Sequence, residues 1–201
     1  MTIATPRRMS LEDYLNYDDG TDTRYELVDG VLVAMGNEKR LNEKIALWLI
    51  GQFLPWVPLD LIARGTQIAV QSPSVTIRTP DLMVLTETLD QLLTQASQSV
   101  ITHEMPPPQL AIEVVSPGAV GSENYQRDYV QKPIEYAARG IPEYWIIDPE
   151  RAVVLIGLLQ EGRYQFQAFR GSEAIVSPTF PALNLTASQI LKAGQDGEVN
   201  Q

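Results

Sequence analysis

Cysteine is absent from the 201 residues of this chain, and histidine occurs once, at His103. Without cysteine, neither a disulfide framework nor a thiolate metal site can form. A single histidine excludes the common zinc sites and argues against a Ser–His–Asp triad. His103 stands beside Glu104 in a loop-like stretch, so we expect it to face solvent. The sequence also lacks the glycine-rich loops that bind nucleotide phosphates.

Long apolar runs are missing as well. The best candidate, LNEKIALWLIGQFLPWV, contains Glu43, Lys44 and Gln52, whereas a membrane span needs about 20 predominantly apolar residues. The first residues, MTIATPRRMSLEDY, have no apolar core of a signal peptide. Together with the absence of cysteine, which fits a reducing compartment, this predicts a cytoplasmic protein without a membrane partner.

Positive charge is scarce, with 15 Lys and Arg against 25 Asp and Glu and a net charge of −10. This balance argues against a generic nucleic-acid binder, which usually carries a basic surface. It does not exclude a nuclease, because a site that binds divalent cations must be locally acidic. Any DNA contact must therefore come from a local group of arginines, and Arg64, Arg78 and Arg127 are candidates by their closeness to the acidic motifs below.

Length and composition predict one folded domain over residues 1–193. Apolar residues make up 44% and charged residues 20%, as in soluble globular proteins. The polar end GQDGEVNQ, residues 194–201, is expected to be a disordered tail. The central order of elements is helix, three strands, helix, strand. This order indicates an α/β (α+β) fold, with helices on the faces of a mixed sheet.

Local patterns predict the elements of the N-terminal half. Ser10 caps a short helix at 10–15, and Asp29-Gly30 turns a β-hairpin at 24–35. Apolar residues at helical spacing predict a helix from Asn37 to about Phe53. Strands are expected at 61–71 and 81–85, and an excursion with one helical turn at LDQLL fills 86–108. The aromatic residues Trp48, Phe53 and Trp56 are expected in the core or at a dimer face.

The C-terminal half reads as strand, helix, strand, hairpin and helix. The strands QLAIEVVS and EYWIIDP are continuously apolar, as in strands covered on both faces. Between them lies a helix from Ser122 to Gly140, in which Pro133 is expected to produce a kink. Glu161-Gly162 turns a second hairpin, and Thr186 caps a last helix.

Two carboxylates stand out because of their surroundings. Asp81 follows Pro80 at the start of a strand, which alone is an ordinary turn position. Glu113 lies inside the apolar run LAIEVV, where an unpaired carboxylate costs several kcal/mol. It therefore needs an arginine, a proton or a metal ion. Glu26, in the first hairpin, poses the same problem less strongly, since a hairpin often exposes one face.

Lys132 belongs to the helix that directly follows the Glu113 strand. A right-handed connection can lay this helix back on the same sheet. Asp128 and Lys132 are separated by four residues and project from one helical face, which Tyr125 and Tyr136 extend. On this helix alone, an exposed ion pair worth a few tenths of a kcal/mol is the more common arrangement.

Taken in order, these motifs resemble a known family. The motifs are RYELVDG with Glu26, TPDLMV with Asp81, EVVSPG with Glu113, and RDYVQKPIEYAARGIPEYWIIDP with Asp128 and Lys132. They look like the bacterial restriction-endonuclease-like family of unknown function in the PD-(D/E)XK nuclease superfamily. The resemblance runs from SLEDYL to NLTASQIL. It implies a restriction-endonuclease-like mixed central sheet flanked by helices, with β-hairpin additions at the N-terminal and C-terminal sides.

The resemblance also implies roles for individual residues. Asp81 resembles the Asp of the PD motif, and Glu113 resembles the acid of the second motif. Val115 stands where the usual lysine would be, and Lys132 resembles that lysine relocated to the next helix. Glu26 resembles an additional acid of the N-terminal hairpin. Catalytic roles are therefore expected for Asp81, Glu113, Lys132 and Glu26.

The implied activity is that of a metal-dependent endonuclease that hydrolyses phosphodiester bonds in DNA. Asp81, Glu113 and the backbone carbonyl of Val114 would hold Mg²⁺, with Mn²⁺ able to substitute. Lys132 would stabilise the charged transition state or orient the attacking water. A homodimer is expected, since two-fold pairs are the commonest assemblies and cutting two strands favours two sites.

A second interpretation is a catalytically inactive protein that keeps the nuclease fold as a binding or scaffold module. The net charge of −10, Val115 in the usual lysine position and Pro133 directly after Lys132 favour it. Fold resemblance alone does not decide between the two interpretations. Magnesium binding that depends on Asp81 would favour the enzyme.

Overall fold

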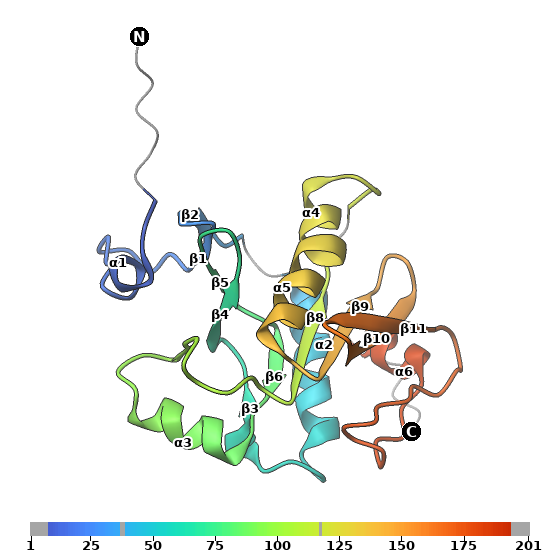
Figure 1. The fold of residues 1–201 in the computed structure, drawn as a ribbon. Helices are drawn as coiled ribbons and strands as arrows, with labels where there is room; N and C mark the ends of the chain where they lie inside the picture. The colour runs from blue at the N-terminus through green and yellow to red at the C-terminus, as the bar shows by residue number, and fades with distance from the viewer. Residues whose placement is uncertain (1–7, 37–38, 117, 194–201) are drawn as a thin grey trace.

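The computed structural model describes residues 8–36, 39–116 and 118–193 (Figure 1). The predicted tail, 194–201, lies outside the described residues. Two mixed β-sheets form the body of the protein, one of five strands in the order β2-β1-β5-β4-β7 and one of six in the order β11-β10-β9-β8-β6-β3. With helices packed on the larger sheet, this architecture confirms the predicted α/β (α+β) class.

The five-stranded sheet is built from two hairpins and a short parallel strand. Its members are β1 (Tyr25–Val28), β2 (Val31–Ala34), β4 (Gln67–Gln71), β5 (Val75–Arg78) and β7 (Val100–Ile101). The turn between β1 and β2 has φ values of 48° at Asp29 and 78° at Gly30, so the predicted hairpin is confirmed. Sequence patterns did not reveal β5 or β7, which are short and flanked by polar residues.

The six-stranded sheet carries the rest of the apolar strands. Its members are β3 (Ile62–Ala63), β6 (Leu82–Val84), β8 (Leu110–Val114), β9 (Glu143–Asp148), β10 (Val153–Gln160) and β11 (Arg163–Phe169). β8 and β9 are parallel, and the other neighbours are antiparallel. The predicted hairpin at Glu161-Gly162 joins β10 to β11, with positive φ at both turn residues.

One predicted strand, 61–71, is wrong. The chain forms a 3₁₀ turn, η1 (Leu59–Leu61), then β3, and then leaves the six-stranded sheet to begin β4 in the other sheet. Gly65, with φ of +85°, lies in this link and adopts a backbone conformation that other residues rarely take. The chain crosses back at Thr79–Asp81, between β5 and β6. These two links therefore lie at the junction of the sheets.

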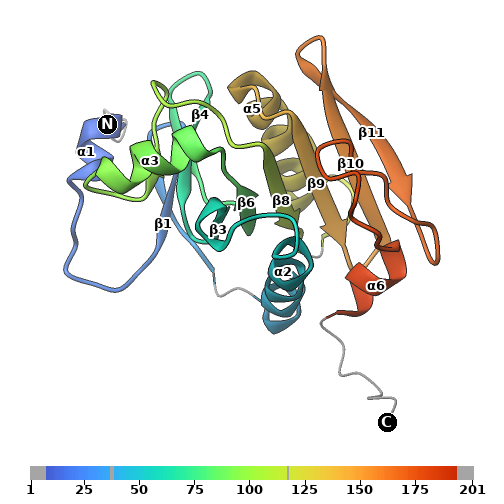
Figure 2. The same ribbon diagram turned by 90° about the horizontal axis from the view of Figure 1, so that it is seen from below.

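Helices cover both faces of the six-stranded sheet (Figure 2). α2 (Arg40–Phe53) and α6 (Ala187–Lys192) pack on one face, and α5 (Lys132–Arg139) packs on the other. Along β8, Leu110, Ile112 and Val114 join the α2 side of the core, whereas Ala111 shares the α5 side with Tyr136. Both faces of β8 are covered, which explains why its sequence is apolar apart from Glu113.

The remaining helices are α1 (Leu11–Leu15), α3 (Glu87–Gln95) and α4 (Glu123–Gln126). Ser10 caps α1 as predicted, and α3 is longer than the single turn expected there. The described part of α2 starts at Arg40, and residues 37–38 of its predicted range lie outside the described residues. Of the aromatic residues, Phe53 is in the core, while Trp56 is 56% exposed. His103 is exposed, as expected.

The helix predicted from Ser122 to Gly140 contains a π-helical turn. α4 is followed by η2 (Arg127–Gln131), a π turn in which the Lys132 N–H bonds to the Arg127 carbonyl, and then by α5. Pro133 thus lies in the first turn of α5, where its missing N–H is tolerated. The sequence predicts a kink at Pro133, and the irregularity that the structure shows is the π turn directly before α5. Such turns are frequent at functional sites. Within the described residues, no helix is long and apolar enough to cross a membrane.

Candidate functional site

Glu113 finds its partners on the helix that packs over it. The Lys132 ammonium donates to Glu113 Oε2 at 2.7 Å, and the Tyr136 hydroxyl donates to Oε1 at 2.7 Å. Glu113 is only 4% exposed and Lys132 only 6%. The buried carboxylate in the apolar strand is therefore compensated by a lysine and a tyrosine from α5, which the connection from β8 lays back on the sheet. Neither residue was among the partners expected for Glu113 from the sequence.

Burial and charge act in opposite directions on this pair. Burial raises the pKa of Glu113, and the positive charge of Lys132 only partly offsets that effect. Burial lowers the pKa of Lys132, but the nearby carboxylates of Glu113, Glu26 and Asp128 outweigh it and leave this pKa above its ordinary value. Lys132 therefore carries its proton throughout the neutral range.

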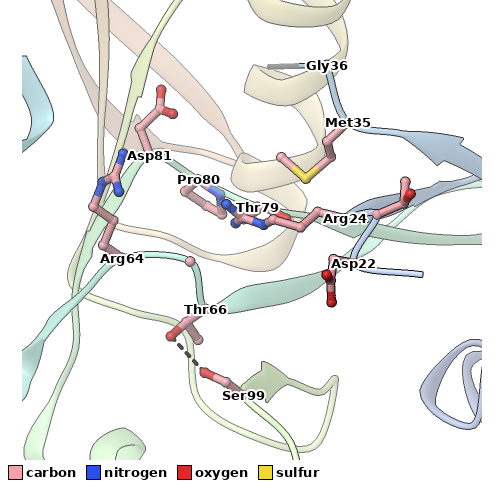
Figure 3. Close-up of a pocket in the computed structure, with 12 residues that line it drawn as sticks. Asp22, Arg24, Met35, Gly36, Arg64, Thr66, Thr79, Pro80, Asp81 and Ser99 are labelled. Atoms are coloured by element: carbon pink, nitrogen blue, oxygen red, sulfur yellow. Dashed lines mark hydrogen bonds between the residues drawn. The ribbon is translucent and has the colours of Figure 1, made fainter. Parts of the chain in front are cut away.

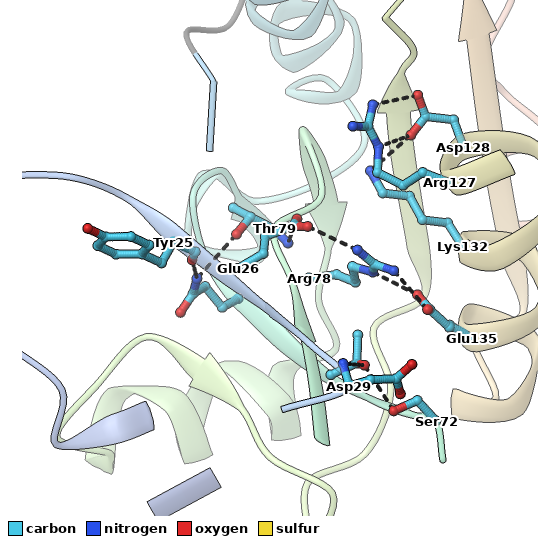
Figure 4. Close-up of polar contacts among 12 residues, drawn as sticks. Tyr25, Glu26, Asp29, Ser72, Arg78, Thr79, Arg127, Asp128, Lys132 and Glu135 are labelled. Carbon is cyan, nitrogen blue, oxygen red and sulfur yellow. Dashed lines mark hydrogen bonds and ion pairs between the residues drawn. The ribbon is translucent and has the colours of Figure 1, made fainter. Parts of the chain in front are cut away.

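Asp128, about one helical turn before Lys132, is a further carboxylate beside the Glu113–Lys132 pair. Its Oδ1 lies 3.5 Å from the Lys132 ammonium, and both of its oxygens accept from Arg127, at 2.7 and 2.9 Å (Figure 4). Asp128 is 2% exposed. The expectation of an exposed Asp128–Lys132 pair is therefore wrong, because this face of the helix lies against the sheet.

Asp81 stands opposite Glu113, where the neighbouring strands β6 and β8 of the six-stranded sheet meet the cavity described below. β6 and β8 are antiparallel with Leu82 facing Ile112, and continuing that register by one residue brings Asp81 opposite Glu113. Asp81 Oδ2 accepts from the Val114 N–H at 2.6 Å. The Asn42 side chain of α2 donates to the carbonyl of the same residue, Val114, at 2.7 Å.

These groups line one cavity, which has a volume of about 350 Å³. Asp81, Glu113, Val114 and Lys132 all line it, together with residues of the first hairpin and of η2. Asn42 and Asp128 line it too. The structure therefore brings together the predicted metal ligands and the predicted lysine, from three different elements.

Glu26 also lines this cavity, but its carboxylate bonds to other groups than Lys132. Its Oε2 is 3.1 Å from an Arg78 nitrogen, and its Oε1 accepts from the Thr79 N–H at 2.9 Å. Arg78 also makes two bonds of 2.8 Å to the Glu135 carboxylate on α5 (Figure 4). Arg78 is 1% exposed, so it offers no surface to nucleic acid, contrary to its selection as a possible DNA contact.

The Glu26–Arg78–Glu135 chain of ion pairs links the two sheets through α5. Glu26 and Arg78 belong to the five-stranded sheet, and Glu135 lies between Lys132 and Tyr136 in sequence. Sequence reasoning missed Arg78 and Glu135 in this role. The available signal was the basic residue Arg78, two positions before the Pro80-Asp81 motif.

A second set of contacts fixes the π turn. The Tyr129 hydroxyl donates to Asp148 on β9, and Arg151 bonds the same carboxylate at 2.8 Å. The Arg151 guanidinium lies 5.4 and 5.5 Å from the ring centres of Tyr125 and Tyr129, which stack on each other. Because Asp148 ends β9 next to β8, these contacts hold the helix start close to the Glu113 strand.

Comparisons with known proteins agree with this fold. The chain is similar over 92% of its length to a crystal structure described as "a putative nuclease belonging to DUF820" from Anabaena variabilis ATCC 29413, with a TM-score of 0.70, 15% sequence identity and 99% of that chain covered. At this identity the likeness shows the fold alone. No curated protein matched the chain. The model of the Uma2 family, described as "Putative restriction endonuclease", matches residues 11–188. The chain therefore belongs to the Uma2 family of restriction-endonuclease-like proteins.

Proposed function

We propose that the protein is a divalent-metal-dependent endonuclease that hydrolyses phosphodiester bonds in DNA. One observation carries the proposal. Asp81 and Glu113, at the ends of adjacent strands, line one cavity with the buried, protonated Lys132. A metal-assisted phosphoryl transfer requires carboxylates that bind the metal ion and a cation that stabilises the charge on the phosphate, and these two carboxylates and one ammonium group can fill those roles. The family and the fold neighbour, described as nucleases, support the same reaction class.

The donor atoms fit a hard cation such as Mg²⁺. This ion prefers oxygen ligands, often takes only one or two carboxylates from the protein and keeps several waters. The described residues contain no group of three or more His, Cys, Asp or Glu arranged to hold a metal, so the ligands would be Asp81, Glu113 and the Val114 carbonyl. That carbonyl accepts one bond, from Asn42, and a second lone pair remains. Mn²⁺, with similar ligand preferences, would substitute.

A bound divalent ion would supply Lewis acidity and lower the pKa of a coordinated water. The protein's own residues supply the rest. The Lys132 ammonium has three N–H donors and directs one to Glu113. A further donor can bond a phosphate oxygen in the cavity and stabilise the charge that develops there. Tyr136, bonded to the other oxygen of Glu113, holds that carboxylate in place.

Glu26 contributes in a different way from a direct ligand. Its negative charge helps to keep the pKa of Lys132 high. Its bond to the Thr79 N–H anchors the chain two residues before Asp81. We therefore assign Glu26 to positioning Asp81 and to keeping Lys132 charged.

Cleavage assays test the proposal. Purified protein is incubated with plasmid DNA, single-stranded DNA and RNA, with Mg²⁺, Mn²⁺ or EDTA. We expect metal-dependent DNA cleavage that falls at least about 100-fold in Asp81→Asn and in Lys132→Met. Asp60→Asn, at an exposed position in η1, is the matched control and should cleave like the wild type. Cleavage that is equal in all variants, or restricted to RNA, would overturn the proposal.

One observation favours an inactive binding or scaffold protein as the second candidate. Both oxygens of Glu113 are already bonded, to Lys132 and Tyr136. Titration calorimetry with Mg²⁺ separates the two candidates. Binding that disappears in Asp81→Asn supports the enzyme, whereas no binding and no cleavage support the scaffold.

We further propose a homodimer, since cutting two strands favours paired sites. Leu54, Trp56 and Leu59, near the end of α2, are 46, 56 and 63% exposed and offer apolar surface for such a contact. Light scattering of the purified protein gives the mass directly. A monomer at all concentrations would exclude this assembly.

A further inference from the structure

A second and larger cavity adjoins the site. It has a volume of about 780 Å³ and shares Met35, Gly36, Thr79 and Asp81 with the smaller cavity. The two cavities therefore meet at Asp81. A chain-like ligand whose reacting group lies beside Asp81 would continue from one cavity into the other.

The walls of this cavity come from the junction of the two sheets (Figure 3). Arg24, directly before β1, forms one side. Arg64, in the link from β3 to β4, forms the other. The hydroxyls of Thr66 and Ser99, 2.9 Å apart, lie between them.

Both arginines direct their charged ends into the cavity. Figure 3 shows the Arg24 side chain extending across the cavity towards Pro80 and the Arg64 side chain rising from the opposite wall. A terminal nitrogen of Arg24 lies 3.7 Å from the place that a Cβ on Gly65 would occupy. The guanidinium of Arg24 thus reaches the link that carries Arg64.

Two further arginines near the site form internal ion pairs. Arg78 is buried between two glutamates, and Arg127 forms a two-pronged pair with Asp128. Arg24 and Arg64 are both exposed. In a protein of net charge −10, attraction of phosphates depends on such local groups. Asp22 and Asp81 also line the cavity, so the positive charge that can attract a phosphate there comes from the two guanidinium groups.

We propose that this cavity binds the sugar–phosphate backbone of the nucleic-acid strand beside the phosphate that is cleaved, with Arg24 and Arg64 as its phosphate contacts. A planar guanidinium can donate two parallel hydrogen bonds to two oxygens of one phosphate. The Thr66 and Ser99 hydroxyls can bond sugar or phosphate oxygens. The inference rests on the proposed function, since it names how that substrate is held.

The test measures binding without chemistry. Fluorescence anisotropy of a labelled DNA oligonucleotide in EDTA gives the Kd at several salt concentrations. The proteins are the wild type, Arg24→Gln, Arg64→Gln, the double variant and Arg163→Gln. Arg163 is exposed on β11 and lines neither cavity, so its variant controls for net charge. Thermal melting of each variant confirms that it is folded.

We expect each variant of the cavity to bind several-fold more weakly and to lower the slope of log K against log salt by about 0.7–0.9, the value of one phosphate contact. Arg163→Gln should leave the slope unchanged. A double variant with the wild-type slope, or a wild type that binds no oligonucleotide, would refute the inference. Cleavage by the wild type would in that case still support the endonuclease. Conversely, if the cavity variants lower the salt slope but the wild type cleaves no nucleic acid, the binding inference stands and the endonuclease proposal is refuted.

Discussion

The ammonium nitrogen of Lys132 lies 2.7 Å from Oε2 of Glu113, and both side chains are buried. The lysine belongs to α5 and the glutamate to β8, so this pair joins a helix to the strand beneath it. Each charge is compensated mainly by the other. Removing one partner leaves the second charged and largely buried, which costs more than the pair itself contributes.

The first prediction concerns the removal of one charge from this pair. Lys132→Met keeps the length of the side chain but leaves the Glu113 carboxylate without its cation. We expect the free energy of unfolding to fall by about 3–5 kcal/mol. Denaturant unfolding at neutral pH, followed by circular dichroism, measures the change.

The double variant Lys132→Met, Glu113→Gln is the control. It removes both charges and keeps a hydrogen-bonding side chain for Tyr136, so much of the lost stability should return. A double variant as unstable as the sum of the two single variants would show that the pair is not coupled.

The second prediction concerns Arg78, which holds the first hairpin and α5 together. Arg78→Met leaves Glu26 and Glu135 as buried anions without their guanidinium, and we expect a loss of about 3–5 kcal/mol in the free energy of unfolding. Arg163→Met, at an exposed position, should change it by less than about 0.5 kcal/mol. Equal effects at the two positions would contradict the role of Arg78. Denaturant unfolding measures both.

Sequence patterns report contacts between residues that are close along the chain. This separation decides which parts of the site could be predicted. The approach of Lys132 to Glu113, 19 positions earlier, was accessible from one right-handed strand–helix connection together with the family resemblance, although a direct ion pair between them was not predicted. The Arg78–Glu135 pair joins residues 57 positions apart on different layers. No local period reports such a contact, since it depends on how the two sheets meet.

The strand predicted at 61–71 shows the same limit in the fold. In the sequence, Ile62, Ala63 and the apolar residues of β4 together predict one strand. In the structure, Gly65 is where the chain changes sheets. Likewise, Pro133 indicated an irregular helix. Only the backbone hydrogen bond from the Lys132 N–H to the Arg127 carbonyl identifies a π turn there.

The third prediction concerns the end of α5, which carries Lys132 and Tyr136. Gly140 ends the helix with φ of 82°, and a Cβ there would meet its nearest atom only at 4.0 Å, on Pro107. The strain of a substitution is therefore in the backbone. We expect Gly140→Ala to cost about 1–2 kcal/mol of stability and Gly140→Asn to cost less, since Asn tolerates this conformation. Thermal unfolding compares the two, and equal losses would instead indicate a packing effect.

The last prediction is a loss of stability at alkaline pH. Burial, reinforced by the charge of Glu113, raises the pKa of Tyr136 well above its ordinary value of 10.0. The net effect of burial and the surrounding carboxylates also raises the pKa of Lys132 above its ordinary value of 10.5. The native state therefore keeps protons that the unfolded chain has released, so stability is fully present below pH 10.0 and decreases as the pH rises through these values.

Each such proton steepens the decrease by about 1.4 kcal/mol per pH unit. Denaturant unfolding at a series of pH values, from neutral to about pH 11, measures the slope. Tyr136→Phe should give a shallower slope than the wild type, because one of the retained protons is gone. Tyr17→Phe, at an exposed tyrosine, is the matched control and should keep the wild-type slope. A stability that is constant across this range would show that neither buried group retains its proton in the native state.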